Sequence, residues 1–253
     1  MENQLGIKSP PSTFWLNDTK ISEKDINKGA LTRYVTNLLI VNEDPTYQLS
    51  LRGSLTLVRF DTRYLGICCR HQIKGCDIEK IGIFLSCGKT IVTSNGGFWL
   101  ANDNSIDAFD LLLLDFSDTV KEHPELASRF FAFDETPPDY SGVSPRLLQV
   151  SGFPYFHQKY ELDNGFFGST NFTCICDDPK EISDPSLIRI TTSYELDFDP
   201  DGLSGGSVFS VQLDKNIQGR VFFAGIVTRA GKNHVHFIKS DYIKVAMVHA
   251  LKC

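Results

Sequence analysis

The sequence lacks a run of about 18 apolar residues, the length that a membrane-spanning helix needs. It also lacks a dense run of lysine and arginine, and its formal charge is −6, so it has no electrostatic footprint of a duplex-binding protein. The first residues, MENQLGIKSPPSTF, are polar and contain no apolar segment of the kind found in secretory signals. We therefore expect a cytoplasmic protein with neither a membrane nor a nucleic acid as its partner.

A disulfide framework is a second feature that the sequence does not predict. The cysteines are odd in number, and no secretory signal points to an oxidising compartment; they are Cys68, Cys69, Cys76, Cys87, Cys174, Cys176 and Cys253. This pattern favours reduced thiols. Most of them are expected to serve as small buried hydrophobic residues.

Two groups of cysteine and histidine residues suggest other kinds of site, a cysteine nucleophile and a zinc site. Cys68 and Cys69 lie close to His71, which would suit a cysteine nucleophile, but no glycine-rich turn surrounds the pair. The C-x-C pair at 174–176 and the H-x-H pair at 234–236 would each face one side of a strand, and together they could bind zinc. Neither pair has the usual C-x-x-C spacing, so we expect no metal and no cofactor.

Short strand-like segments fill most of the 253 residues. They are alternating or continuously apolar, and turn residues separate them. Many short strands without helices between them indicate an all-β sandwich or barrel and argue against a parallel α/β sheet. Examples are GSLTLVRF (53–60), YLGICCR (64–70), KIGIFLS (80–86), FDLLLLDF (109–116), RLLQVSGFP (146–154), GSVFSVQL (206–213) and VFFAGIVTR (221–229).

Three further segments help to divide the chain. Residues 27–42 fit a helix at their start and a strand towards Ile40 and Val41. The segment Ser240–Leu251 opens with a possible N-cap serine and has apolar residues at helical spacing, which predicts a terminal helix. The polar stretch 134–145, DETPPDYSGVSP, has no periodicity and separates two strand-rich regions.

The motif DGLSGGSV, residues 201–208, carries the strongest chemical signal. Ser204 is flanked by Gly202, Gly205 and Gly206, so its backbone can turn tightly and leave the hydroxyl clear of neighbouring side chains. In acyl transfer, the N–H groups of Gly202 and Ser204 would be the natural donors to an oxyanion. The alternative reading is a glycine-rich turn that only introduces a strand.

A serine nucleophile needs a base, and the base needs an acceptor that orients it. Of the six histidines, His71 is placed best, because it follows the strand-like run YLGICCR and would emerge at a strand end. Asp110 stands at the front of the apolar run FDLLLLDF, where a carboxylate entering a core needs a partner. Asp107 and Asp115 are its rivals.

In this order, the motifs resemble those of the trypsin/chymotrypsin-like serine proteases, over roughly residues 50–251. GLSGGSV is similar to the serine motif of that family, FDLLLLDF to its aspartate strand, and GSLTLVRF with YLGICCRH to its histidine hairpin. QVSGFP resembles the element that opens the second barrel, and FFAGIVTRAG the strand that walls the primary specificity pocket.

The resemblance implies an all-β fold of two antiparallel six-stranded β-barrels, chymotrypsin-like, with a C-terminal helix. Residues 1–46 would form a partly helical N-terminal extension. Residues 47–138 would form the first β-barrel with His71 and Asp110, and residues 139–253 the second with Ser204. The active site would then lie in the cleft between the barrels.

The resemblance also implies a specificity pocket with Phe198 at its floor and Gly225 and Val227 in its wall. An apolar floor predicts a preference for small or apolar residues. If the neighbouring Asp197 or Asp199 reached inside instead, lysine or arginine would be preferred.

Some residues depart from the family pattern. Leu203 precedes the serine where many secreted zymogens carry an acidic residue, and an apolar side chain cannot pair with a freed N-terminus. Cys69 and Arg70 stand where small residues usually precede the histidine. With no family disulfide pattern evident, the chain resembles the intracellular, non-zymogen branch.

These observations predict a serine endopeptidase that acts on a protein or peptide through an acyl-enzyme on Ser204. His71 would be the general base and acid, and Asp110 would orient it. A regulatory protein is a further candidate partner. The alternative is a catalytically inactive protease-fold protein that binds peptides or a partner, which the departures at Cys69 and Arg70 motivate.

Overall fold

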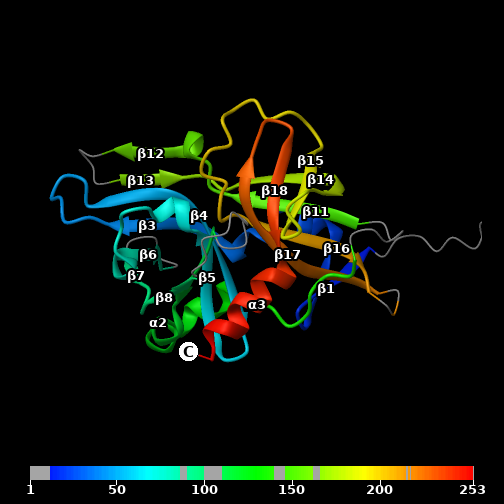
Figure 1. The fold of residues 1–253 in the computed structure, drawn as a ribbon, viewed down its shortest axis with the longest axis horizontal. Helices are drawn as coiled ribbons and strands as arrows, with labels where there is room; N and C mark the ends of the chain where they lie inside the picture. The colour runs from blue at the N-terminus through cyan, green and yellow to red at the C-terminus, as the bar shows by residue number, and fades with distance from the viewer. Residues whose placement is uncertain are drawn as a thin grey trace, which may run out of the picture.

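The computed structural model describes residues 12–85, 90–99, 110–139, 146–161, 166–214, 216 and 218–252. Strands dominate these residues and form two large sheets that lie next to each other (Figure 1). The C-terminal helix α3 (Ser240–Ala250) contacts β17 and β18 of one sheet and β8 of the other. The predicted all-β double-barrel architecture with a terminal helix is confirmed.

The sheet of the C-terminal half closes into a six-stranded barrel. Its strand order is β16-β11-β14-β15-β18-β17, and β16 also pairs with β17, which brings the sheet back onto itself. At Gly225, φ is +155° and a Cβ would lie 1.9 Å from the carbonyl oxygen of Ile238, so the β17–β18 pairing needs a glycine there. The strands are β11 (Arg146–Gly152), β14 (Phe172–Glu181), β15 (Leu187–Thr192), β16 (Ser207–Leu213), β17 (Gly219–Ala230) and β18 (His234–Lys239).

The sheet of the N-terminal half curls, and within the described ranges its two end strands do not pair with each other. Its order is β7-β6-β3-β4-β5-β9-β8, with β10 (Phe131–Ala132) added on β4. Strands β3 and β9 are buried along almost their whole length, so both of their faces are covered. The strands of this sheet are β3 (Val35–Val41), β4 (Leu49–Phe60), β5 (Arg63–Cys69), β6 (Ile81–Phe84), β7 (Ile91–Thr93), β8 (Gly97–Trp99) and β9 (Leu111–Asp115).

The N-terminal segment joins both sheets instead of standing apart from them. Strands β1 (Thr13–Leu16) and β2 (Thr19–Ser22) form a hairpin, and β1 pairs in parallel with β17 of the second barrel. A short helix, α1 (Glu23–Asn27), follows and is capped by the Ser22 side chain. Since β3 begins at Val35, the last part of the expected extension already belongs to the first barrel.

Smaller elements complete the described chain. Strands β12 (Gln158–Glu161) and β13 (Phe166–Ser169) pair as a separate hairpin, and α2 (Ser117–Glu122) follows β9. Part of the expected linker, residues 140–145, lies outside the described residues. None of the helices in the described ranges is long and apolar enough to cross a membrane.

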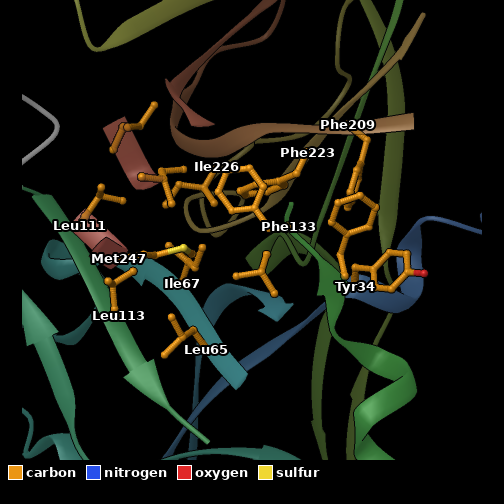
Figure 2. Close-up of a cluster of buried hydrophobic side chains, with 14 of the residues drawn as sticks. Tyr34, Leu65, Ile67, Leu111, Leu113, Phe133, Phe209, Phe223, Ile226 and Met247 are labelled. Atoms are coloured by element: carbon orange, nitrogen blue, oxygen red, sulfur yellow. The ribbon is translucent and has the colours of Figure 1, made fainter. Parts of the chain in front are cut away.

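One hydrophobic cluster connects the two barrels. Figure 2 shows Ile67 and Leu111 of the first barrel facing Ile226 of the second, with Met247 of α3 between them. All four side chains are almost completely buried. Each barrel also has a cluster of its own, so the shared cluster fixes how the two barrels sit against each other.

Candidate active site

The first barrel brings His71 and Asp110 together. Strand β5 ends at Cys69, and the next residues form a short 3-10 turn, Arg70–Ile73, that carries the histidine. Strand β9 pairs with β5 so that Leu111 lies opposite Cys69, which places Asp110 beside this turn. His71 Nδ1 lies 2.6 Å from Asp110 Oδ2, and the His71 backbone N–H donates to Asp110 Oδ1 at 3.1 Å.

This contact determines the state of the imidazole ring. A carboxylate can only accept hydrogen bonds, so Nδ1 carries the proton and the Nε2 lone pair is free to accept one. The His71 side chain is 52% exposed, which leaves the ring open to a bound molecule. Of the rival aspartates, Asp115 pairs with Arg63 at the other end of β9 at 2.5 Å, and Asp107 lies outside the described residues.

Ser204 lies in a tight turn that leads into β16. On either side of it, Gly202 and Gly205 have φ values of +94° and +78°, a region that favours glycine. A Cβ on Gly202 would lie 2.8 Å from the carbonyl oxygen of Phe153, and one on Gly205 would lie 2.1 Å from that of Ser54. The glycines of the motif therefore allow both the turn and its close approach to other backbone.

Every carbonyl of this turn from residue 201 to 206 accepts a hydrogen bond from the protein. The donors come from both barrels, so the turn is held at the junction. In chain order, the carbonyl and donor pairs are Asp201 with Tyr155 N, Gly202 with Ser54 Oγ, Leu203 with Gly206 N, Ser204 with Gln72 Nε2 and Ser54 N, Gly205 with Thr56 Oγ1, and Gly206 with Val227 N.

In contrast to the carbonyls, not all N–H groups of the turn have a hydrogen-bond partner among the described residues. Leu203 N donates to Pro200 O at 3.0 Å and Gly205 N to Val227 O at 2.8 Å. For Gly202 N and Ser204 N, no protein acceptor is found within the described part of the chain. These two amide N–H groups of the serine turn are thus available as donors to an anionic oxygen.

The hydroxyl of Ser204 and the imidazole of His71 line the same hollow between the barrels. The first barrel contributes His71 and Asp110; the second contributes Ser204 with Pro200, Asp201, Thr228, Arg229 and Ala230. Ser204 Oγ donates to the carbonyl oxygen of Thr228 at 2.8 Å, and no hydrogen bond between Ser204 and His71 occurs among the described residues. Use of the serine as a nucleophile thus requires its hydroxyl to leave Thr228.

Cys69 is the other nucleophilic side chain near His71. Its sulfur, a His71 ring nitrogen and an Asp110 oxygen lie within 4.8 Å of one another, a grouping that could ligate a metal ion. However, the Cys69 side chain is fully buried, its Sγ contacts Val227 O at 3.5 Å, and burial raises the pKa of the thiol well above its usual value. A thiol held in its protonated form is a poor nucleophile and a poor metal ligand.

The residues expected to form a specificity pocket are mostly inside the second barrel. Val227 has no exposed surface, and Gly225 is paired within β17. Phe198 is 7% exposed and stacks on the exposed Phe156, with ring centroids 5.7 Å apart. The hollow that contains Ser204 is lined instead by the acidic Asp201, the neutral Thr228 and the basic Arg229.

The cysteine pair and the histidine pair of the second barrel lie on opposite faces of its sheet. Cys174 and Cys176 are buried in the core of this barrel, with their sulfur atoms 3.8 Å apart. His234 and His236 are half-buried, and they alternate with the buried Val235 along β18. Because neighbouring strand residues point to opposite faces, the histidines face away from the core that holds the cysteines.

Sequence reasoning missed four residues that shape the hollow or the turn. Thr228 and Arg229 belong to the segment FFAGIVTRAG, so the resemblance could have pointed to them. Ser54 and Gln72 gave no such signal, because their contacts with the serine turn cross from one barrel to the other.

Comparison with known proteins gives the fold but no sequence family. No protein-family model matches the chain, and no curated protein matches it in sequence. A solved structure of an inactivated protease paralogue from the scabies mite matches with a TM-score of 0.50 and 11% identity, over 87% of this chain and 94% of that one. Human heparin binding protein matches with a TM-score of 0.54 and 8% identity, over 87% and 92%.

At this level of identity, the likeness concerns the fold alone. The chain has the chymotrypsin-like double-barrel fold, which makes it a protein of the protease fold class. Because one fold can carry both active and inactive sites, the function has to be argued from the residues in the hollow.

Proposed function

We propose that this protein is a serine endopeptidase in which Ser204 is the nucleophile, His71 the general base and acid, and Asp110 the residue that orients His71. The observation that supports this most is the site itself: the His71–Asp110 contact at 2.6 Å shares one hollow with Ser204. In the same turn, the N–H groups of Gly202 and Ser204 have no acceptor within the part of the chain that the structure describes.

The reaction would proceed in two halves. His71 Nε2 takes the proton from Ser204 Oγ as this oxygen attacks the carbonyl carbon of a peptide bond, and Gly202 N and Ser204 N donate to the resulting oxyanion. The imidazolium, stabilised by Asp110, gives its proton to the leaving amine as the C–N bond breaks. Water, deprotonated by His71, then hydrolyses the acyl-enzyme and restores the serine.

The second candidate function is binding of a peptide or partner without catalysis. The hydrogen bond from Ser204 Oγ to Thr228 O favours it, because a hydroxyl in this position does not donate to His71. A mismatch of this kind is also found in unliganded active enzymes, in which catalytic hydrogen bonds tighten only once substrate is bound. The two functions therefore differ in whether Ser204 can be acylated or phosphonylated.

A fluorophosphonate probe, which reacts covalently with activated serines, separates the two functions. We expect the wild-type protein to be labelled and Ser204→Ala and His71→Ala to be unlabelled, as seen by intact mass. Ser128, an exposed serine between β9 and β10, gives the matched control Ser128→Ala, which should be labelled like the wild type. A folded wild-type protein that stays unlabelled would exclude the enzyme and leave the binding function.

A further inference from the structure

Gln72 is buried directly behind His71, and its side-chain amide bonds to both barrels. Its Nε2 donates to the carbonyl oxygens of Ser204, at 2.8 Å, and of Arg52 and Ser54, at 3.0 and 3.2 Å. Its Oε1 accepts from the Cys69 N–H at 2.8 Å. Because the amide nitrogen faces only carbonyl oxygens and the amide oxygen faces an N–H, this orientation of the amide is well defined.

Ser54 contacts the same turn from strand β4. Its buried hydroxyl donates to the carbonyl oxygen of Gly202 and accepts from the backbone N–H of Phe153, both at 2.8 Å. Its own N–H donates to the carbonyl oxygen of Ser204 at 3.3 Å. Ser54 and Gln72 thus bind two carbonyls of the serine turn, those of residues 202 and 204.

The planarity of the peptide bond shows what these contacts do. In a trans peptide, the C=O of one residue and the N–H of the next point in opposite directions. In the units 202–203 and 204–205, Ser54 and Gln72 bind the carbonyls, and the N–H groups of the same units donate to other backbone carbonyls, so both planes are fixed at both ends. The N–H groups of Gly202 and Ser204 belong to the adjoining units 201–202 and 203–204, and neither donates to an acceptor among the described residues.

We propose that Ser54 and Gln72 are positioning residues for the oxyanion site: by fixing the peptide planes 202–203 and 204–205 against the first barrel, they limit the rotation of the adjoining planes, which carry the N–H groups of Gly202 and Ser204. This inference rests on the proposed function. Gln72 also follows His71 in the 3-10 turn, so it connects the backbone that carries the base to the backbone that carries the nucleophile.

The contacts of Gln72 and Ser54 with the serine turn are closely packed, so the backbone there has little room to shift. A Cβ on Gly205 would lie 2.8 Å from Gln72 Oε1, and one on Gly53 would lie 3.0 Å from Gln72 Nε2 and 2.7 Å from Gly202 O. Loss of the amide or the hydroxyl leaves buried carbonyls unpaired, which favours rotation of the peptide units that they belong to.

The test compares Gln72→Met with Gln149→Met. Gln149 is also a buried glutamine, and it lies in β11 with no hydrogen bond to the serine turn among the described residues, so the second variant makes the same chemical change elsewhere. We expect Gln72→Met to slow phosphonylation by a fluorophosphonate and acylation by p-nitrophenyl acetate by up to about 100- to 1,000-fold, the range for a lost oxyanion donor. Gln149→Met should react within about twofold of the wild type.

Two measurements distinguish positioning from a general loss of structure. With p-nitrophenyl acetate, the acylation rate constant should fall while the pH midpoint of acylation stays at the wild-type value, because the His71–Asp110 contact is unchanged. Ser54→Ala should give the same pattern and serves as the second variant if Gln72→Met does not fold. Thermal unfolding of each variant establishes that the rates are measured on folded protein.

The outcomes separate this inference from the function on which it rests. If the folded wild type reacts with neither reagent, the proposed enzyme fails, and the inference fails with it. If the wild type reacts and folded Gln72→Met and Ser54→Ala react as fast as Gln149→Met, only the positioning role is overturned. A shifted pH midpoint would also overturn it, because the variants would then act on His71 instead of the oxyanion site.

Discussion

Asp110 is the residue whose contacts are most specific in the candidate site. One of its carboxylate oxygens faces the ring nitrogen of His71, and the other accepts from the backbone N–H of the same residue. It therefore fixes both the tautomer of the ring and the place of the turn that carries it. Asp115, five positions later at the far end of β9, pairs with Arg63 instead.

We expect Asp110→Asn to lower the acylation rate of the enzyme by about 10⁴-fold, because an amide can donate to Nδ1 and hold the ring in the wrong tautomer. Rates of p-nitrophenyl acetate acylation measure this. Asp115→Asn makes the same chemical change on the same strand and should alter thermal stability with little effect on the rate. Equal rates in Asp110→Asn and the wild type would show that Asp110 does not orient a catalytic histidine.

At this scale, the structure has the expected His71–Asp110 contact and places Ser204 in the same hollow, but the sequence did not indicate every contact. The glycine-flanked serine, the histidine after a strand and the aspartate before one could be found because each stands at a fixed place in a local pattern. Their approach depends on strand register, which places Leu111 opposite Cys69. Gln72 looked like any polar residue in a turn, because its partners lie on β4 and on the serine turn.

Among the larger elements, strand β18 carries an unusual histidine. His236 Nδ1 is buried and has no hydrogen-bond partner within the described residues. Burial, together with the charges of His234, Arg229 and Arg189, lowers the pKa of His236 to about 4. The neutral form is thus the one that the folded protein accommodates.

This shift predicts a pH-dependent stability that belongs to β18. An unfolded histidine has a pKa of about 6.5. As the pH falls from there towards 4, the unfolded chain therefore binds a proton that the folded protein does not, and stability is lost. We expect His236→Gln to make the free energy of unfolding, measured in urea between pH 7 and 4, fall less steeply than in the wild type. An unchanged slope would contradict the assigned cause.

The elements differed in how well their sequences predicted them. The strands around the site and the terminal helix were expected close to their observed bounds, because continuous apolar runs and a helical spacing are strong local signals. The N-terminal segment was expected to stand apart, whereas β1 pairs with β17 and Leu16 and Ile26 are buried. A pairing between positions more than two hundred residues apart has no local signature.

For the molecule as a whole, the shared cluster couples the two barrels. It contains residues of both sheets together with Ile243, Ala246 and Met247 of α3. Because one core is common to both halves, neither half can unfold without exposing apolar surface of the other.

We therefore expect a single unfolding transition. Trp15 lies in β1 on the second barrel and Trp99 in β8 of the first, so Trp99→Phe and Trp15→Phe leave one fluorescent reporter on each. Their midpoints in denaturant should coincide. Met247→Ala should lower the free energy of unfolding by about 2–5 kcal/mol and shift both midpoints together. Two separate midpoints would show that the barrels are independent units.

The fold class could be predicted from the sequence, because many short strands with one terminal helix leave few architectures. The sequence could not show how fully each sheet closes. The second sheet returns on itself through β16 and β17, whereas the first curls around a core partly shared with α3. Closure depends on strand tilt and bulges summed over a whole sheet, which no single segment reveals.

At the serine turn, the acceptors of the hydrogen bonds between the barrels are main-chain carbonyls, and glycines allow the two chains to approach closely. Carbonyls of the serine turn face β4, and β4 approaches so closely that Gly53 and Gly205 have no room for a side chain. Carbonyl and amide groups are the same in every residue, so most side chains nearby could be exchanged over time while this architecture persisted. The two solved structures that match this chain share its fold at 8–11% identity, so the same backbone architecture can be built from sequences in which few side chains are the same.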